Sequence, residues 1–475
     1  MERRTFMTAL LAGPALLAVL QACGSSSGSG ANTPGTGATP ATGTTPGTGT
    51  PPGTGTTPGT GTTPGTGTAK GAPAGVARSD KPRAASCLCD TDAAVAVVND
   101  FGVDLYNRLT AAGSEPQPNL VFSPGSIAIA LAMTRAGAKG KTATEMDTVL
   151  HVADPAALPL SMNALTTGLA ERTQRIEVPG GEAVDITLSI ANSLWAQQGV
   201  AFETAFLDLL ATQYGAGLQL VGYERDPDGA RMVINAWVDD ETKHRIPELL
   251  APGTITSDTR LTLVNAIYLK APWLSVFDER ATAPADFTTN SGTVVKPPTM
   301  HLTDHLNYKA GAGWQAVELA YYTNLLSMLI VLPDAGRSLD DGVAALDSLR
   351  TGADSRKVTL SLPKFDIESA VELGAVLSAL GMPTAFTEDA DFSGMTTAAK
   401  LKIAAVAHQA NITIDEKGTE AAAATAVGMA TAAPAQPEQP IDFVVDRPFV
   451  FAVRDNPTGA LLFLGHIGDP TKTRS

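Results

Sequence analysis

Cysteine is scarce in this chain, with three residues among 475. A fold held together by several disulfides is therefore excluded. Cys87 and Cys89 are separated by a single residue, a spacing at which a disulfide between them is strained. Oxidation to each other, a link between two chains and the reduced state all remain open for this pair. A metal site would need further ligands, which are absent nearby.

Positive charge is also low. Lys and Arg together number 33 against 48 Asp and Glu, which gives a formal net charge of −15 at pH 7. Because phosphate backbones and sulfated polysaccharides bind to basic surfaces, we expect no nucleic acid and no heparin-like polyanion among the partners.

Catalytic motifs are missing as well. None of the six histidines stands beside a Gly-x-Ser-x-Gly turn, and the sequence has neither a phosphate-binding loop nor a dinucleotide fingerprint. His301 and His305 have the spacing of a zinc-binding helix, but Pro297 and Pro298 precede them and no helical periodicity surrounds them. We therefore expect a protein that is not an enzyme and that holds neither a metal nor a cofactor.

The first 22 residues have the layout of a secretory signal, since Arg3 and Arg4 precede an almost wholly apolar run from 6 to 20. That run is too short for a comfortable spanning helix. It ends in Leu20-Gln-Ala-Cys23, which resembles a bacterial lipoprotein processing site. The resemblance implies that Cys23 is lipidated and that the protein is extracytoplasmic, anchored to a bacterial membrane at the outer membrane or the cell surface. A simple signal peptide cut nearby is the alternative.

Residues 24–86 have almost no large apolar side chain, so they cannot offset the entropy that is lost on folding. Six hexads of the type Thr-Pro-Gly-Thr-Gly-Thr fill 33–68, and this period is too short for a solenoid unit. We therefore expect residues 23–89 to comprise the lipidated cysteine and a disordered tether. Residues 90–475 are expected to form one domain.

Within that domain, helical periodicity dominates early and strand-like runs dominate late. This order favours an α+β fold with mainly antiparallel sheets. Helices are expected at 92–109, 124–136, 142–150, 159–174, 203–214 and 227–242. Strands are expected at 185–195, 262–270, 314–319, 325–332, 358–367, 401–414 and 441–454.

The segment 415–440, between the last two expected strands, has neither a charge nor an aromatic ring from Ala421 to Pro437. Its four consecutive alanines favour a helix, but Gly428 and the prolines that follow oppose a long one. With period two, one face is apolar or hydroxylic and the other is small. Such a segment suits an exposed loop that later becomes a central strand. An alanine-rich linker is the alternative.

Several motifs of this domain resemble the serpin family and occur in serpin order, over roughly 90–470. They are NLVFSPGS at 119–126, similar to the start of the shutter helix; NAIYLKAPW at 265–273, similar to the strand that reaches the breach; EKGTEAAAATAV at 416–427, similar to the hinge of the reactive-centre loop; and RPFVF at 447–451 with GALLFLG at 459–465, similar to the closing strand pair. The resemblance implies a serpin fold with about eight to nine helices, a mobile reactive-centre loop at about 416–440 and an open slot in the large sheet.

The resemblance also implies three groups of site residues. The loop hinge comprises Glu416, Gly418, Thr419, Glu420, Ala421, Ala422, Ala423 and Ala424. Lys364, as the partner of Glu416, and Trp273 are expected at the breach, the top of the sheet where insertion begins. A polar shutter network under the sheet centre is expected from Asn119, Ser123, Ser126, Asn265 and His408, although Ala404 stands where serpins usually carry another serine.

A serpin is a suicide inhibitor, in which loop insertion traps the protease as an acyl-enzyme. The seventeenth residue counted from Glu416 is Ala432, so the expected reactive bond is Ala432–Ala433, with Thr431–Ala432 and Met429–Ala430 as alternatives. A small apolar residue before the bond suits an elastase-like or subtilisin-like serine protease, or a cysteine protease of similar preference. The resemblance thus implies a monomeric inhibitor. A non-inhibitory serpin-fold surface lipoprotein, with a binding or chaperone role, is the alternative.

Overall fold

The computed structural model describes residues 75–111, 118–178, 181–350, 353–420 and 439–473. The chain divides into two units, Met1–Thr66 and Gly67–Ser475. The expected signal peptide, Cys23 and most of the expected tether therefore lie outside the described residues. In the described part of the chain, no helix is both long and apolar enough to cross a bilayer.

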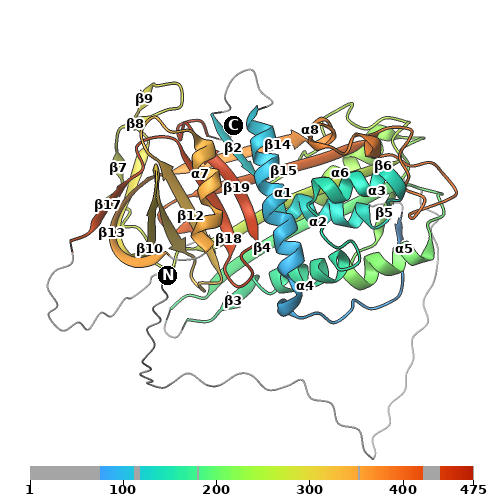
Figure 1. The fold of residues 1–475 in the computed structure, drawn as a ribbon, viewed down its shortest axis with the longest axis horizontal. Helices are drawn as coiled ribbons and strands as arrows, with labels where there is room; N and C mark the ends of the chain where they lie inside the picture. Colours follow the sequence, from blue (N-terminus) through green and yellow to red (C-terminus); the bar gives the residue numbers. More distant parts are fainter. Residues whose placement is uncertain (1–74, 112–117, 179–180, 351–352, 421–438, 474–475) are drawn as a thin grey trace, which may run out of the picture. The chain divides into compact units, whose positions relative to one another are not determined.

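The described residues contain eight α-helices, which agrees with the expected eight to nine. They are α1 (Asp92–Ala111), α2 (Pro124–Arg135), α3 (Gly140–Val149), α4 (Leu158–Ala170), α5 (Thr204–Leu209), α6 (Pro227–Glu241), α7 (Leu339–Ala345) and α8 (Gly374–Leu380). Figure 1 shows α2 to α6 at the right of the domain and the strands β10, β12 and β13 at the left. All six expected helices are present. However, α4 ends four residues early because Gln174–Ile176 pairs with a strand instead.

Helix α2 is the central helix of the domain. Ser123 caps its N-terminus by accepting a hydrogen bond from the Ser126 backbone N–H, and Pro124 occupies the first helical position. Every residue from Pro124 to Thr134 is buried. A helix that is apolar all round needs cover on all sides, and both sheets and neighbouring helices supply it here.

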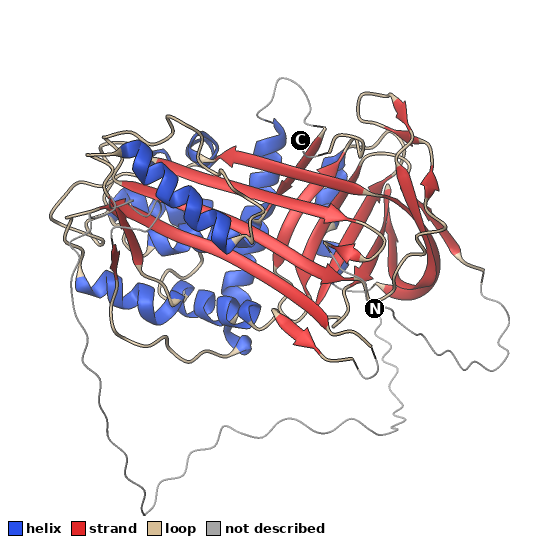
Figure 2. Cartoon of the chain, turned by 180° about the vertical axis from the view of Figure 1, so that it is seen from behind, coloured by secondary structure: helices blue, strands red, loops and turns tan. Residues whose placement is uncertain are grey.

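The first sheet carries the long strands that are visible in Figure 2. Its order is β1 (Gly75–Ala77), β5 (Leu218–Val221), β4 (Val184–Gln197), β6 (Leu261–Pro272), β16 (Gly418–Thr419), β15 (Ala405–Ile414) and β14 (Phe365–Glu372), and β3 (Gln174–Ile176) pairs with β4. Successive side chains of β6 alternate between the two faces. Leu263 and Ile267 join the main core with α2, whereas Val264 and Ala266 join a second core beneath α6.

The second sheet has the order β17 (Ile441–Val444), β13 (Asp354–Pro363), β10 (Pro298–Gly311), β11 (Trp314–Ala320), β12 (Leu326–Pro333), β18 (Phe449–Asp455), β19 (Leu461–Ile467) and β2 (Asn119–Phe122), with β7 (Ala283–Pro284) beside β10. Strands β8 (Phe287–Thr288) and β9 (Val294–Val295) form a separate pair. In the described sheets three pairings are parallel, β4–β5, β6–β15 and β13–β17, so the expectation of mainly antiparallel sheets is confirmed.

Two strands expected from the sequence are each divided into two. The run 358–367 is divided between β13 and β14, which belong to different sheets, and Lys364 is the residue between them. The run 441–454 is divided between β17 and β18, where Pro448 has no N–H to donate to a ladder. Residues 119–122 form strand β2 against β19, and the helix begins at Pro124, after the Ser123 cap, as expected.

In the part of the first sheet that the structure describes, the expected open slot is absent. Strands β6 and β15 pair directly and in parallel, from Thr262 opposite Ala405 to Ile267 opposite Ala410. Near the other end of these strands, β16 lies between them and pairs with both. The position between β6 and β15 is therefore closed along one part and already occupied by a short strand along the other.

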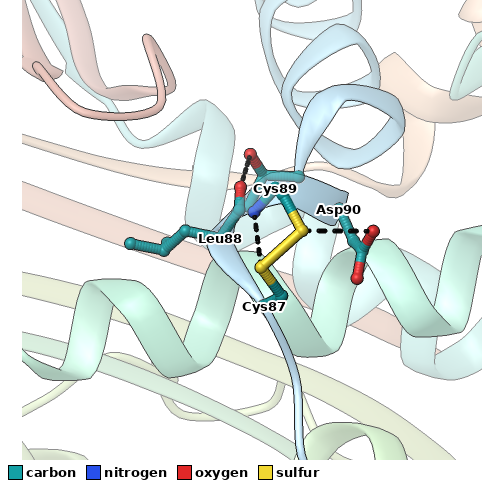
Figure 3. Close-up of a disulfide and its surroundings, with 5 residues drawn as sticks. Cys87, Leu88, Cys89 and Asp90 are labelled. Atoms are coloured by element: carbon teal, nitrogen blue, oxygen red, sulfur yellow. Dashed lines mark hydrogen bonds between the residues drawn. A yellow bond between two sulfur atoms is a disulfide. The ribbon is translucent and has the colours of Figure 1, made fainter. Parts of the chain in front are cut away.

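Cys87 and Cys89 form a disulfide in the turn that precedes α1 (Figure 3). The Cys87 sulfur also accepts a hydrogen bond from the Cys89 backbone N–H, at 3.3 Å. Of the three states that the sequence left open, the structure has the bond within one chain.

Candidate functional site

The described part of the expected hinge enters the first sheet as β16. Gly418 lies opposite Pro272 of β6, and Thr419 lies between Ala271 of β6 and Ile414 of β15. Gly418 has a φ of +150°, and a Cβ at this position would lie 2.2 Å from the Ala271 carbonyl oxygen. No side chain fits there, so glycine is required for the chain to enter between the two strands.

Thr419 is held from its side chain as well as from its backbone. It is 1% exposed, and its hydroxyl lies 2.7 Å from the Tyr321 hydroxyl. Tyr321 is itself buried and stacks on Trp273, with ring centroids 4.6 Å apart and an angle of 15° between the planes. Nothing in the sequence around Tyr321 distinguished it from an ordinary core tyrosine.

Trp273, expected at the breach, directly follows β6 and binds the segment that leads into the hinge. Its indole N–H donates to the Asp415 carbonyl at 2.9 Å, and its backbone N–H donates to the Lys417 carbonyl at 2.8 Å. The Asp415 carboxylate accepts hydrogen bonds from the backbone N–H groups of Lys417 and Gly418. The turn before β16 is thus fixed by backbone and side-chain bonds together.

The structure brings Lys364 and Glu416 together, as the sequence led us to expect. Lys364 Nζ lies 2.6 Å from Glu416 Oε2, and the Thr282 hydroxyl donates to Glu416 Oε1 at 2.8 Å. The Glu416 side chain is 9% exposed and that of Lys364 is 35% exposed. Burial raises the pKa of the Glu416 carboxyl, but the bonds from Lys364 and Thr282 outweigh it, and the pKa lies below its usual value.

Glu420 is the last hinge residue that the structure describes. It has a left-handed backbone, with a φ of +51°, which differs from the extended conformation of a strand. Its carboxylate lies 2.9 Å from Arg245 Nη2, in the segment after α6, and the side chain is 6% exposed. The hinge residues Ala421, Ala422, Ala423 and Ala424, the expected reactive bond Ala432–Ala433 and its alternatives at Thr431 and Met429 lie outside the described residues.

Four of the five expected shutter residues meet under the centre of the first sheet. His408 of β15 lies 3.2 Å through Nδ1 from Asn265 Oδ1 of β6, and its Nε2 accepts the Ser123 backbone N–H at 3.0 Å. These partners require the neutral tautomer with the proton on Nδ1. Burial lowers the pKa of His408 to about 3, so the ring is uncharged at neutral pH. Ser126 lies in the first turn of α2, after the Ser123 cap, and is fully buried.

Asn119 does not join that network. Its side-chain oxygen accepts the backbone N–H groups of Gly468 and Asp469, and its amide donates to the Asp469 and Lys472 carbonyls. It therefore holds the C-terminal segment beside β2. This departure follows from the strand at 119–122, which carries Asn119 away from the cap of α2.

Asn192 takes part instead and was missed from the sequence. The Ser126 hydroxyl donates to Asn192 Oδ1 at 2.7 Å, and Asn192 lies directly opposite Asn265 in the ladder between β4 and β6. The available signal was an amide side chain inside an otherwise apolar strand pattern.

The histidines with zinc-like spacing, His301 and His305, lie in strand β10 and not in a helix. His301 Nδ1 lies 3.0 Å from the Ser361 hydroxyl of the neighbouring strand. No group of three His, Cys, Asp or Glu side chains suited to a metal ion is found within the described ranges.

Comparisons with known proteins agree with this geometry. A family model described as Serpin (serine protease inhibitor) matches residues 96–470. The chain is 36% identical over 380 residues to a serpin-like protein of Thermococcus kodakarensis, covering 79% of this chain and 85% of that one. It is 36% identical over 386 residues to the leukocyte elastase inhibitor of Sus scrofa, covering 78% and 97%. Among solved structures, the serpin Serpin48 of the insect Tenebrio molitor is similar, with a TM-score of 0.67, 29% identity and coverage of 78% and 97%.

Proposed function

The chain belongs to the serpin family, and from this premise we propose that it inhibits a serine protease of small apolar specificity by acting as a suicide substrate. The observation that carries the proposal is β16. The first residues of the hinge, Gly418 and Thr419, already occupy a strand position between β6 and β15. This strand lengthens when Glu420 leaves its left-handed conformation and further residues of the same segment separate β6 from β15.

The chemical step starts at the reactive bond. The serine hydroxyl of the protease attacks the Ala432 carbonyl carbon and loses its proton to the protease histidine. The bond from that carbon to the Ala433 nitrogen breaks, and the nitrogen leaves as an amine with the proton from the histidine. An ester then joins Ala432 to the protease. Inhibition requires that water does not hydrolyse this ester.

Insertion of the cleaved segment supplies that protection. Residues after Thr419 extend β16 and replace the direct pairing of β6 with β15. Each new ladder hydrogen bond stabilises the inserted form by about 1 kcal/mol net. The protease travels with the ester. Because the oxyanion hole and the catalytic triad depend on sub-ångström placement, the distortion stops deacylation.

Two further observations support an inhibitor of this class. The hinge from Thr419 to Ala426 carries no bulky or proline residue that would block a strand, and its one charge is Glu420. One relative that is 36% identical is named leukocyte elastase inhibitor. An elastase cleaves after small apolar residues, as the expected bond after Ala432 requires.

Incubation of the mature protein with pancreatic elastase tests the proposal. We expect a covalent complex that resists denaturant, and a C-terminal fragment that begins with Ala433 (APAQ) or, for the first alternative bond, with Ala432 (AAPAQ). The variant Ala432→Arg provides a matched control, because it should form the complex with trypsin and lose the one with elastase. Inhibition of trypsin by the wild-type protein without any effect on elastase would contradict the proposed bond.

Thermal unfolding separates inhibitory insertion from the non-inhibitory alternative. Cleavage between Val427 and Pro437 should raise the melting temperature by tens of degrees, because a central strand is added to the first sheet. A clean cut that leaves the melting curve unchanged would indicate a non-inhibitory serpin.

A further inference from the structure

A cavity of about 320 Å³ lies between α2, α4, β4 and the π-helical turn Leu210–Tyr214 that follows α5. Most of its wall is apolar and comes from Ile129 and Met133 of α2, Leu169 of α4 and Leu188 of β4. None of the described hinge residues lines it. Small-molecule sites in proteins have volumes of about 300–1,000 Å³ and combine an apolar wall with a few polar groups.

One of the polar groups in this cavity is a guanidinium without a counter-ion. Arg83 donates through Nε to Asn163 Oδ1 at 2.7 Å and through Nη2 to the Asn163 carbonyl and the Thr166 hydroxyl. All of these acceptors are neutral, and no carboxylate among the described residues forms an ion pair with Arg83. The Arg83 side chain is exposed, and its partial burial lowers the pKa of the guanidinium.

Tyr214 is the second polar group. It is 8% exposed and lines the cavity, and its buried hydroxyl has no hydrogen-bond partner among the described residues. A buried hydroxyl without a partner costs free energy that a suitable ligand atom would recover. Burial also raises the pKa of Tyr214, so the group remains a hydroxyl donor.

From these features we propose that the cavity binds a small amphipathic carboxylate, with its anionic head between Arg83 and Tyr214 and its alkyl chain against the walls from α2, α4 and β4. The three hydrogen bonds of Arg83 use Nε and Nη2, so Nη1 can donate to a ligand. A guanidinium binds a carboxylate better than it binds any neutral acceptor. The cavity is at the lower end of the size range of small-molecule sites and suits a short ligand. That size matches a medium-chain fatty acid such as octanoate.

The cavity also touches the centre of the first sheet. Asn192, which lines it, accepts the hydrogen bond from Ser126 in the shutter network. A ligand in this position therefore contacts both α2 and β4, the two elements that this hydrogen bond joins.

Calorimetric titration of the full mature chain tests the proposal with three probes. Octanoate has the head and the tail, octan-1-ol has only the tail, and acetate has only the head. We expect octanoate to bind at a single site and to raise the melting temperature, and the other two to bind at least tenfold more weakly, because a charge-assisted hydrogen bond or the apolar contact is lost. Equal binding of octanoate and octan-1-ol, or no binding of octanoate, would overturn the proposal.

Variants locate the site. Arg83→Met should reduce octanoate affinity on the order of tenfold or more. Arg78→Met removes the same charge from an exposed position of the same segment and should leave affinity unchanged. Ala216→Leu fills the cavity without touching the bonds of Arg83, so it distinguishes a blocked site from a loosened fold. If both Arg83→Met and Ala216→Leu bind octanoate as the wild type does, the ligand lies elsewhere and the assignment is wrong.

Discussion

The hydroxyl groups of Thr419 and Tyr321 lie 2.7 Å apart in a site from which water is excluded, since the two residues are 1% and 0% exposed. One residue belongs to the hinge of the reactive-centre loop, and the other follows β11 of the second sheet. The hydrogen bond therefore joins the first inserted residues to a part of the domain that lies outside the first sheet.

Replacement of Thr419 tests this link. Thr419→Arg places an unpaired charge in a buried site, which costs several kcal/mol, so we expect β16 to leave the sheet. Insertion should then be slower than deacylation, and the variant should be cleaved by elastase and released. Thr419→Ser keeps the hydroxyl and should behave as the wild type. A covalent complex of Thr419→Arg at the original stoichiometry would show that the buried face is assigned incorrectly.

Lys364→Met should lower the free energy of unfolding by about 1.5–3 kcal/mol at pH 7, the usual contribution of a hydrogen bond to a charged group. Because the pKa of Glu416 is lowered in the native state, its contribution is present above the unfolded value of 4.5 and is lost as the pH falls through the native value. The variant should therefore lose less stability than the wild type below pH 4.5, as measured by urea unfolding. Lys402→Met breaks the exposed pair with Glu388 and should leave the free energy of unfolding almost unchanged.

His408 should make the free energy of unfolding depend on pH over a range different from that of Glu416. Its pKa is about 3 in the native state and 6.5 when unfolded, so the neutral ring contributes fully above pH 6.5. The contribution is lost as the pH falls from 6.5 towards 3, with a slope of about 1.4 kcal/mol per pH unit. The free energy of unfolding of His408→Gln, measured with urea between pH 7 and 5, should depend less steeply on pH than that of the wild type. The difference should correspond to one bound proton. An unchanged slope would mean that another group is responsible.

Arg245→Met should speed the spontaneous insertion of the uncleaved loop. Strand β16 can lengthen only if Glu420 leaves its left-handed conformation, and the ion pair with Arg245 holds it there. Without the pair the barrier is lower, so the native form should convert several-fold faster on warming, as followed by native gel electrophoresis. Lys243→Met removes an exposed charge two residues away and should convert at the wild-type rate.

Cys23→Ser tests the proposed membrane anchor. If the cysteine is lipidated, the variant should move from the membrane fraction to the soluble fraction or accumulate unprocessed. Mass spectrometry of the wild-type protein provides the control. An unlipidated, soluble mature form would contradict the membrane anchor and would indicate a simple secretory signal peptide.

The sequence predicted elements with strong periodicity and capping signals well. Helix α2 has both a serine cap and a proline at its first position, and α6 has an aspartate cap followed by a proline, so both were placed within one residue. The junction at Lys364 was missed because β13 and β14 form one apolar pattern, and only tertiary structure assigns them to different sheets.

The candidate site was predicted where short motifs resemble those of the family, as with Glu416 and its partner Lys364. It was missed where a residue is defined only by a distant contact, as with Tyr321, Asn192 and Arg245. The entry of Gly418 and Thr419 into the sheet could not be predicted, because it depends on the free-energy difference between two pairings of the same strands.

Strand β1 lies at one end of the first sheet and pairs with the outer side of β5 through only three residues, Gly75 to Ala77. A sheet edge that is left uncovered is a template for another chain and a common origin of aggregation. Truncation just before α1 at Asp92, a natural choice for producing the protein without its repeats, would uncover β5. Recombinant forms that begin ahead of Gly75 keep this protection and are the better material for concentrated solutions.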